Sequence, residues 1–256
     1  MKDRVVVITG ASSGIGAALA PLLVAEGARV VLVARRRPLL EQVAEGLGPN
    51  ALVVVADVTK RADFERVVAE ALERFGRIDV LVNNAGRGIS RPVSELTDED
   101  FDSMMRVNVK SALYGMQAVL PHFRERGEGQ IVNVSSMLGR VPFAPIRSAY
   151  AAAKHALNSL SANLRMELRA THPGIVVSVV HPGVVRTEFG TNALHGGPDS
   201  RSLPNSQSAE EVAAVILDTI RTRRIDAYTR PEARALVANY YAAEDLDEVE
   251  GRPPFR

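Results

Sequence analysis

The stretch RVVVITGASSGIG (4–16) joins an apolar run to a glycine-rich turn and decides the fold. Its first half predicts a buried β-strand, and the Ala- and Leu-rich residues that follow predict a helix. Gly10 permits a tight turn, Gly14 lets the backbone approach a pyrophosphate, and Gly16 allows close helix packing. The helix N-terminus offers free N–H groups and a partial positive charge to phosphate. The stretch therefore favours a nucleotide-binding strand–turn–helix unit over a purely structural turn, with a G-x-x-x-G-x-G spacing that lengthens the first turn.

Strand-like and helix-like segments alternate along the rest of the chain. Apolar runs at 4–9, 29–34, 51–57, 78–83, 130–135, 174–183 and 225–229 predict strands, and segments near 14–26, 37–47, 60–75, 98–124, 148–170 and 208–223 predict helices. Strands that are apolar throughout are covered on both faces, and this alternation is typical of parallel βαβ units. The sequence predicts one α/β domain over 1–256, a doubly wound parallel sheet of about seven strands flanked by helices.

Composition excludes several classes of function. The 256 residues carry a net charge of +1, which argues against nucleic acid or a membrane surface as a partner. There is no cysteine, so disulfides and thiolate metal sites are excluded, and the five histidines lack ligand spacing. The N-terminus is typical of a strand rather than a signal peptide. We expect a metal-free protein in the cytoplasm, whose reducing conditions suit a chain without cysteine.

The end of the second predicted strand bears on the choice of nucleotide. Ala34 is followed by Arg35, Arg36 and Arg37. An acidic residue here would bind the 2′-hydroxyl of NAD, whereas guanidinium groups bind a 2′-phosphate. The sequence therefore favours NADP(H) over NAD(H), and the alternative is a solvated basic helix start.

The ends of the third and fourth predicted strands should lie at the same edge of the sheet as the glycine-rich turn. Asp57 ends the third strand and is positioned to accept a hydrogen bond from adenine, or else to cap the next helix. In NNAG (83–86), the asparagines can bind neighbouring backbone while Ala85 and Gly86 leave room for a cofactor. From the residues alone, a plain turn explains NNAG equally well.

Tyr150 and Lys154 stand four residues apart in a predicted helix, downstream of Ser136 in NVSS. Residues i and i+4 share a helix face, so the two side chains point the same way. A nearby ammonium would lower the phenol pKa and suit it to proton transfer, while the serine hydroxyl could bind a carbonyl oxygen. The alternative for the pair alone is an ordinary helix with a half-buried tyrosine and a solvated lysine.

The ordered set of motifs resembles the classical branch of the short-chain dehydrogenase/reductase family over about 3–190. The matching residues are TGASSGIG (9–16), Asp57, NNAG (83–86), Asn108, Ser136, Tyr150, Lys154 and PGVVRT (182–187). The resemblance implies a single-domain Rossmann fold and hydride transfer between NAD(P)(H) and an alcohol or carbonyl. With the residues above, it implies cofactor contacts from Gly10, Ser12, Ser13, Gly14, Ile15, Gly16, Arg35, Arg36, Asp57, Val58, Asn84, Ala85, Gly86, Tyr150, Lys154, Pro182, Gly183, Val185 and Thr187.

The resemblance also implies catalytic roles. Tyr150 would act as general acid or base, and Lys154 would lower its pKa and hold the nicotinamide ribose. Ser136 would bind the carbonyl oxygen, and Asn108 would anchor a water beside the lysine. The interval from Ser136 to Tyr150 is one residue longer than the usual family pattern, and the Pro-containing segment 140–147 can absorb the difference. Ser135 is the alternative to Ser136.

The leading interpretation is an NADP(H)-dependent carbonyl reductase or alcohol dehydrogenase. A non-catalytic NADP(H)-binding redox sensor is the alternative, and sugar-nucleotide epimerase or dehydratase chemistry is disfavoured because little chain remains after 190 for a second domain. By resemblance we expect a homodimer or homotetramer assembled through the helices near 98–124 and 148–170. The small residues Ala152, Ala153 and Ala156 of the second helix would permit close approach, and burial within the monomer is the alternative explanation for them.

Substrate recognition is assigned to the end of the chain. The Gly-, Ser- and Pro-rich segment 190–208 predicts a loop that acts as a substrate lid, with a passive insertion as the alternative. Residues 230–256 form a C-terminal extension that begins as a helix. We expect an apolar carbonyl or alcohol substrate, because Leu138, Val184, Phe189 and Leu194 could line an apolar pocket. The side chain of Arg87, just after NNAG, could face either this pocket or solvent.

Overall fold

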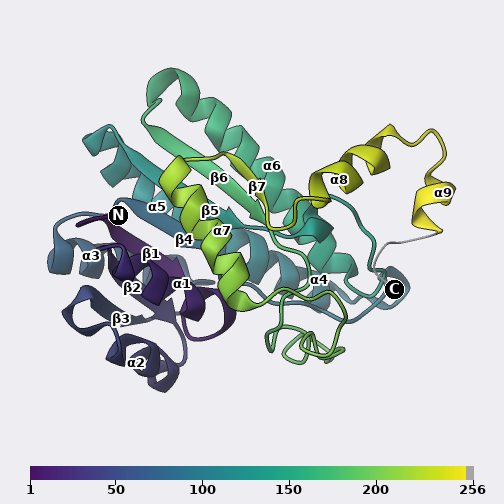
Figure 1. Cartoon of the computed structure of the whole chain (residues 1–256), viewed down its shortest axis with the longest axis horizontal. Helices are drawn as coiled ribbons and strands as arrows, with labels where there is room; N and C mark the ends of the chain where they lie inside the picture. Colours follow the sequence, from purple (N-terminus) through teal and green to yellow (C-terminus); the bar gives the residue numbers. More distant parts are fainter. Residues whose placement is uncertain (252–256) are drawn as a thin grey trace.

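A seven-stranded parallel sheet in the order β3-β2-β1-β4-β5-β6-β7 forms the centre of the computed structural model, which describes residues 1–251 (Figure 1). The strands are β1 (Val5–Thr9), β2 (Arg29–Ala34), β3 (Ala51–Val55), β4 (Val80–Asn83), β5 (Gly129–Val134), β6 (Ile175–His181) and β7 (Asp226–Tyr228). All six pairings are parallel. The predicted fold class and strand number are confirmed.

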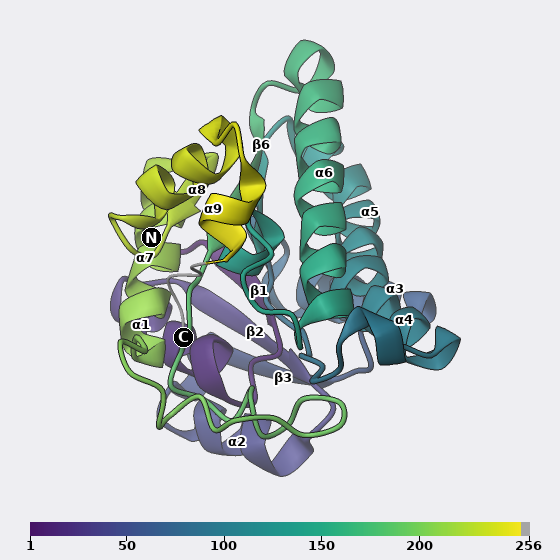
Figure 2. The same ribbon diagram turned by 90° about the vertical axis from the view of Figure 1, so that its right-hand side faces the viewer.

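Helices cover both faces of the sheet. The α-helices of residues 1–251 are α1 (Gly14–Ala25), α2 (Arg37–Glu45), α3 (Arg61–Phe75), α4 (Asp98–Met105), α5 (Ser111–Arg126), α6 (Ser148–Thr171), α7 (Ala209–Thr222), α8 (Ala233–Ala242) and α9 (Leu246–Glu250). Alternate strand residues point to opposite faces, so Val5 and Val7 pack with α3, α5 and α6, while Val6 and Ile8 pack with α1, α2 and α7. Figure 2 shows these two layers on either side of the sheet.

The strand order reverses at β1, which lies between β2 and β4. The chain runs outward from β1 to β3 and then returns to form β4 on the other side of β1. In open parallel sheets, a crevice opens at such a switch point, outside the carboxyl ends of the strands. The glycine-rich turn after β1, the NNAG segment after β4 and Ser136 after β5 therefore lie along one edge.

The helix predicted over 98–124 is interrupted. Thr97 and Asp100 form a capping box at the start of α4, and Arg106–Lys110 then adopt a π-helical turn before α5 begins. A π turn accommodates one extra residue, and such turns occur frequently at functional sites. Apolar periodicity did not reveal it, because the pattern resumes on the same face after the insertion.

The C-terminal extension packs on the segment that follows Ser136. Ala233 and Val237 of α8 share an apolar cluster with Met137, Val141 and Phe143, and Figure 1 shows α8 and α9 at the end of the molecule opposite β3. The last part of the predicted extension, 252–256, lies outside the described residues. Over residues 1–251, no helix is both long and apolar enough to cross a membrane.

Candidate active site

The turn after β1 forms a tight cradle at the N-terminus of α1. Gly10 has φ +68°, and a Cβ added to Gly16 would lie 2.6 Å from the Gly10 carbonyl oxygen. Asn84 fastens the next loop to this turn, because its Nδ2 donates to the Thr9 carbonyl at 2.9 Å. Ser13 makes no side-chain cap, and the first turn of α1 has no acidic residue. The cradle therefore suits a phosphate group, which would accept from the helix N–H groups.

The segment after β6 closes over this cradle. A Cβ added to Gly14 would lie 3.1 Å from the Thr187 side chain, which places 182–187 opposite the glycine-rich turn. Val185 and Ile15 pack on the same apolar cluster. The Pro182 carbonyl accepts from the Met137 amide at 2.8 Å, so this segment is also tied to the residue after Ser136. Gly183 lies on the other side of the segment, facing Arg230.

Two arginines after β2 lie beside the cradle. The Arg36 Nη2 donates to Ser12 Oγ at 3.1 Å and to Ser13 Oγ at 2.9 Å. Both Arg35 and Arg36 are exposed, and the strand ends at Ala34 without a carboxylate. The end of β2 therefore carries positive charge and no negative charge beside the glycine-rich turn.

Asp57 binds within the turn before α3, whose N-cap is Lys60, so the alternative role as a helix cap is not seen. Its Oδ1 accepts from the Thr59 amide at 3.1 Å and from Thr59 Oγ1 at 2.8 Å. These bonds and the Arg35 charge hold its pKa below the ordinary value, against the opposing effect of burial. Val58 beside it is buried.

Buried hydrogen bonds position the helix that carries Tyr150 and Lys154. Asn83 of β4 donates to Asn133 Oδ1 at 2.9 Å, and Asn133 of β5 donates to Ser161 Oγ of α6 at 2.8 Å. All three side chains are buried, so they link two strands to the helix in a medium where hydrogen bonds are strong. These hydrogen bonds fix the middle of α6 against the end of β5.

Ser136, Tyr150 and Lys154 form one buried cluster. Lys154 Nζ lies 5.7 Å from the Tyr150 ring centroid, and Ser136 hydrogen-bonds the tyrosine side chain. The Ser135 hydroxyl instead donates to the Lys154 carbonyl at 3.4 Å. The geometry therefore joins Ser136, rather than Ser135, to the phenol.

The pKa values in this cluster differ from the expectation. Burial raises the pKa of Tyr150 to about 12, and hydrogen bonding with Ser136 and the Arg147 charge oppose this only in part. Burial also lowers the pKa of Lys154 to about 8. The expected lowering of the tyrosine pKa by Lys154 is not seen, because loss of solvation outweighs nearby positive charge. At neutral pH, Tyr150 is a neutral phenol that can donate a proton.

Lys154 and Asn108 lie beside the NNAG loop. Lys154 Nζ donates to the Val134 carbonyl at 2.9 Å, and a Cβ added to Gly86 would lie 3.6 Å from this nitrogen. Asn108, in the π-helical turn, donates to the Arg87 carbonyl at 2.9 Å and accepts from the Arg87 amide at 3.1 Å. Its buried side chain therefore fixes the loop after NNAG.

Apolar side chains surround the tyrosine. Leu138, Phe189 and Leu194 pack on a cluster that contains Tyr150, and the rings of Phe189 and Tyr150 lie 5.4 Å apart. Val184, the fourth expected residue, does not belong to this cluster. The surroundings of the phenol are thus largely apolar.

The segment 190–208 lies against the loop after NNAG. Leu194 N donates to the Gly88 carbonyl and Ser90 N donates to the Leu194 carbonyl, both at 2.9 Å. His195 Nε2 lies 2.7 Å from Asp100 Oδ1, and the exposed Arg87 donates to the Asn192 carbonyl at 3.1 Å. These contacts place the segment at the mouth of the site.

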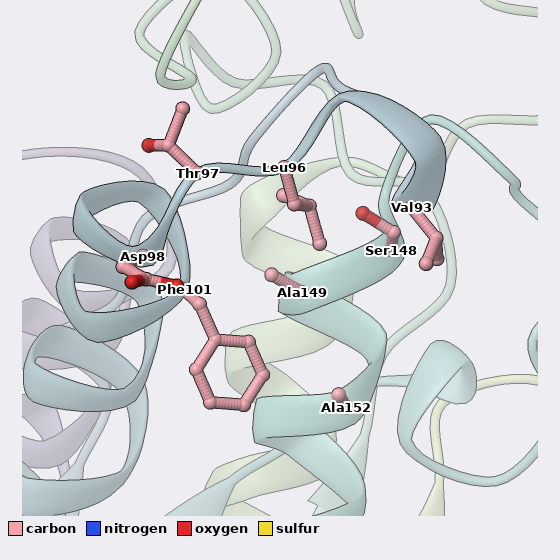
Figure 3. Close-up of a pocket in the computed structure, with 8 residues that line it drawn as sticks. All are labelled: Val93, Leu96, Thr97, Asp98, Phe101, Ser148, Ala149 and Ala152. Carbon is pink, nitrogen blue, oxygen red and sulfur yellow. The ribbon is translucent and has the colours of Figure 1, made fainter.

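A surface pocket of about 350 Å³ lies beside the site and is separate from it. Figure 3 shows Phe101 of α4 and Ala152 of α6 in its wall. Neither Tyr150 nor Ser136 lines it. Its position between the two helices makes it a feature of the outer surface rather than a reaction site.

Sequence reasoning missed Arg147. It precedes α6 as the residue at the N-cap, and its charge acts on Tyr150, three residues away. Its Nη1 donates to the Ile89 carbonyl at 3.0 Å. The i, i+3 spacing to Tyr150 was visible in the sequence, but the direction of a side chain at a helix start was not. Within residues 1–251, no group of acidic or histidine side chains is arranged to hold a metal ion.

Comparisons with known proteins agree with this architecture. A family model described as short chain dehydrogenase matches residues 4–196. An uncharacterized oxidoreductase of Staphylococcus epidermidis is 37% identical over 187 residues, which are 73% of this chain and 80% of that protein.

Two solved structures extend the comparison. A short chain dehydrogenase/reductase from Burkholderia phymatum, in complex with NAD, is 27% identical with a TM-score of 0.86, covering 100% of this chain and 97% of that chain. An alcohol dehydrogenase from the archaeon Thermococcus sibiricus, complexed with 5-hydroxy-NADP, is 29% identical with a TM-score of 0.76, covering 88% and 94%.

Proposed function

Because the chain belongs to the short-chain dehydrogenase family, we propose that it is an NADP(H)-dependent oxidoreductase that interconverts a carbonyl and a secondary alcohol. The observation that carries this proposal is the buried cluster of Ser136, Tyr150 and Lys154 beside the glycine-rich cradle. A protein that only binds a nucleotide has no need of a proton donor there.

The residues of the site divide the reaction between them. When bound, the nicotinamide supplies or accepts the hydride. Tyr150 donates its phenolic proton to the carbonyl oxygen in reduction and takes it back in oxidation. Ser136 donates a hydrogen bond to the same oxygen, where negative charge develops. Lys154, held by the Val134 carbonyl, keeps positive charge close to the phenol.

The preference for NADP(H) over NAD(H) is proposed from the groups beyond β2. Arg36 lies on Ser12 and Ser13 of the cradle, and no carboxylate ends the strand. A guanidinium group favours a 2′-phosphate, whereas an acidic residue would favour a free ribose. Both kinds of dinucleotide occur in the solved relatives, so this chain's own residues carry the argument.

We also propose that 190–208 acts as a lid. The segment contacts the loop after NNAG through Leu194, while His195 reaches Asp100 on α4. Opening would break these few polar contacts and expose the apolar surroundings of Tyr150 to substrate. Closing would exclude water from the reacting carbonyl.

Self-association is proposed through α4, α5 and α6. Phe101 is 44% exposed and Met166 is 62% exposed, and Ala152 also faces solvent. Ala153, however, is fully buried within the chain, so its expected role in a subunit contact is wrong. Light scattering at micromolar concentration should give a dimer or tetramer; a monomer would contradict this proposal.

The chemistry is tested by following NADPH oxidation with a panel of aldehydes and ketones. Tyr150→Phe should lower kcat by roughly 10²- to 10⁴-fold, the usual contribution of a general acid, and leave NADPH binding unchanged. Tyr114→Phe on α5, where Tyr114 stacks with Arg61 instead, is the matched control and should stay active. An active Tyr150→Phe variant, or a wild type that binds NADPH without any turnover, would overturn the proposal.

A further inference from the structure

Arg147 is a cation placed one helical turn before the proposed proton donor. It occupies the N-cap of α6, and residues three apart on a helix are neighbours. Its Nη1 donates to the Ile89 carbonyl at 3.0 Å, which draws the half-buried side chain in toward the site rather than out to solvent. Its positive charge acts to lower the pKa of Tyr150, against the larger effect of burial, which raises that pKa.

Arg147 lacks an acidic partner among residues 1–251, since none of the ion pairs in that part of the chain includes it. Asp100 of α4 is already occupied by Arg91 at 2.9 Å and by His195 at 2.7 Å. Burial lowers the pKa of Arg147, which means that the surroundings disfavour its charge. A partly buried cation without a counter-charge is costly, and an anionic ligand would offset that cost.

A second polar group near Arg147 also lacks a partner. Ser90 Oγ is buried without a hydrogen bond. A Cβ added to Gly197 would lie 2.5 Å from this oxygen and 3.1 Å from Arg147 Nη2, so the two groups converge on one point. Gly197 belongs to the 190–208 segment and covers both groups.

The apolar surroundings of Tyr150 begin next to this point. A Cβ added to Gly88 would lie 3.0 Å from Arg147 Nη1 and 2.9 Å from the Phe189 ring. The Phe189 ring in turn packs edge-on against the Tyr150 ring at 5.4 Å. The guanidinium group and the phenol ring therefore both lie next to the Phe189 ring.

We propose that Arg147 and Ser90 bind a carboxylate of the substrate, so that this chain acts on keto acids and hydroxy acids. The inference rests on the proposed function, which supplies the carbonyl chemistry at Tyr150. The guanidinium group would pair with the carboxylate, and the Ser90 hydroxyl would donate to it. The bound carboxylate would displace the part of the lid that carries Gly197.

The test compares acids with their neutral counterparts. Wild type is assayed with 2-, 3- and 4-keto acids and with the methyl ester of each. A hydrogen bond to a charged group corresponds to a roughly tenfold or larger ratio of affinities. The kcat/KM of wild type should therefore be higher for at least one acid than for its ester by that factor. Arg147→Met should reduce the acid-to-ester ratio to about one. Arg87→Met, which removes an exposed arginine at the same mouth, should keep the preference.

Ser90→Ala provides a second variant that avoids a folding problem, because the Ser90 hydroxyl has no partner to lose. It should lower the acid-to-ester ratio by about threefold or more, the low end for one hydrogen bond. If esters are turned over as well as acids by wild type, or if Arg147→Met keeps the preference, the inference is wrong and the proposed function stands.

A binding measurement separates the inference from turnover. Calorimetry with NADP-saturated protein compares 4-methylpentanoate with 4-methylpentanamide, neither of which can be reduced at a ketone. The carboxylate should bind roughly tenfold tighter to wild type and no tighter to Arg147→Met. If the carboxylate binds tighter but no carbonyl compound is turned over, the proposed function is wrong and the carboxylate site stands. If the two probes bind equally well to wild type, the carboxylate site is wrong.

Discussion

Replacing Arg36 by aspartate tests which dinucleotide the chain binds. Arg36 is exposed and its Nη2 lies within 3.1 Å of the hydroxyls of Ser12 and Ser13. A 2′-phosphate on the adenosine ribose would lie near this guanidinium group if the cradle holds the pyrophosphate. Arg36→Asp removes the favourable charge and puts an unfavourable one in its place, so the change acts on NADPH rather than on NADH.

The size of the effect follows from the exposure of the side chain. A hydrogen bond to a charged group contributes about 1.5 kcal/mol at the lower end of its range, which applies here because solvent screens the pair. An aspartate about 4 Å from the phosphate adds repulsion of about 1 kcal/mol in water. Together these amount to about 2.5 kcal/mol, so the ratio of kcat/KM for NADPH to that for NADH should fall roughly sixtyfold.

The assay is steady-state reduction of one carbonyl substrate with each cofactor in turn. Arg37→Asp is the matched control, because Arg37 is exposed and its Nη1 faces Glu41 at 3.4 Å rather than the cradle. It makes the same change of charge one residue away and should alter the ratio by less than about threefold, as expected of screened surface charge. Equal effects of the two variants, or an unchanged ratio in Arg36→Asp, would refute the role given to Arg36.

Two further predictions concern stability and the cradle. Burial lowers the pKa of Lys154 to about 8 from 10.5, so between these pH values the unfolded chain binds more protons than the native one. The free energy of unfolding of wild type, measured with urea, should therefore rise relative to that of Lys154→Met as pH rises through that window, by up to about 3 kcal/mol. A difference between the two proteins that stays constant with pH would contradict this. Gly16→Ala would place a Cβ 2.6 Å from a backbone oxygen, whereas Gly46→Ala meets no atom within 4 Å. Fluorescence titration should show NADPH binding weakened roughly tenfold by the first change alone, and equal binding by both variants would argue against the cradle.

Much of the fold was predictable because its signals are local. The strand–turn–helix unit at 4–16 is confirmed as β1, the glycine-rich turn and α1. The apolar strands correctly indicated a sheet covered on both faces, since β1 is buried from Val5 to Ile8. The interruption at Arg106–Lys110 was not predictable, because one inserted residue leaves the apolar pattern on both sides intact.

The proximity of Tyr150 and Lys154 was predictable from the sequence, whereas their electrostatics were not. The spacing of Tyr150 and Lys154 correctly indicated a shared face, with the amine 5.7 Å from the ring centroid. The predicted lowering of the tyrosine pKa was wrong, because burial depends on what Phe189 and its neighbours contribute from other parts of the chain. Sequence spacing carries no measure of lost solvation.

The sequence by itself determined the order in which strands and helices follow one another along the chain. It also determined the glycine-rich turn and the tyrosine–lysine pair on one helix. These features depend on residues close together in the chain, where periodicity and backbone freedom act directly. Tertiary structure alone decided that Ser90, Arg147 and Gly197 meet beside Tyr150, and that burial governs the charges there. Three segments far apart in sequence reach one edge only because the parallel sheet brings its carboxyl ends and their loops together.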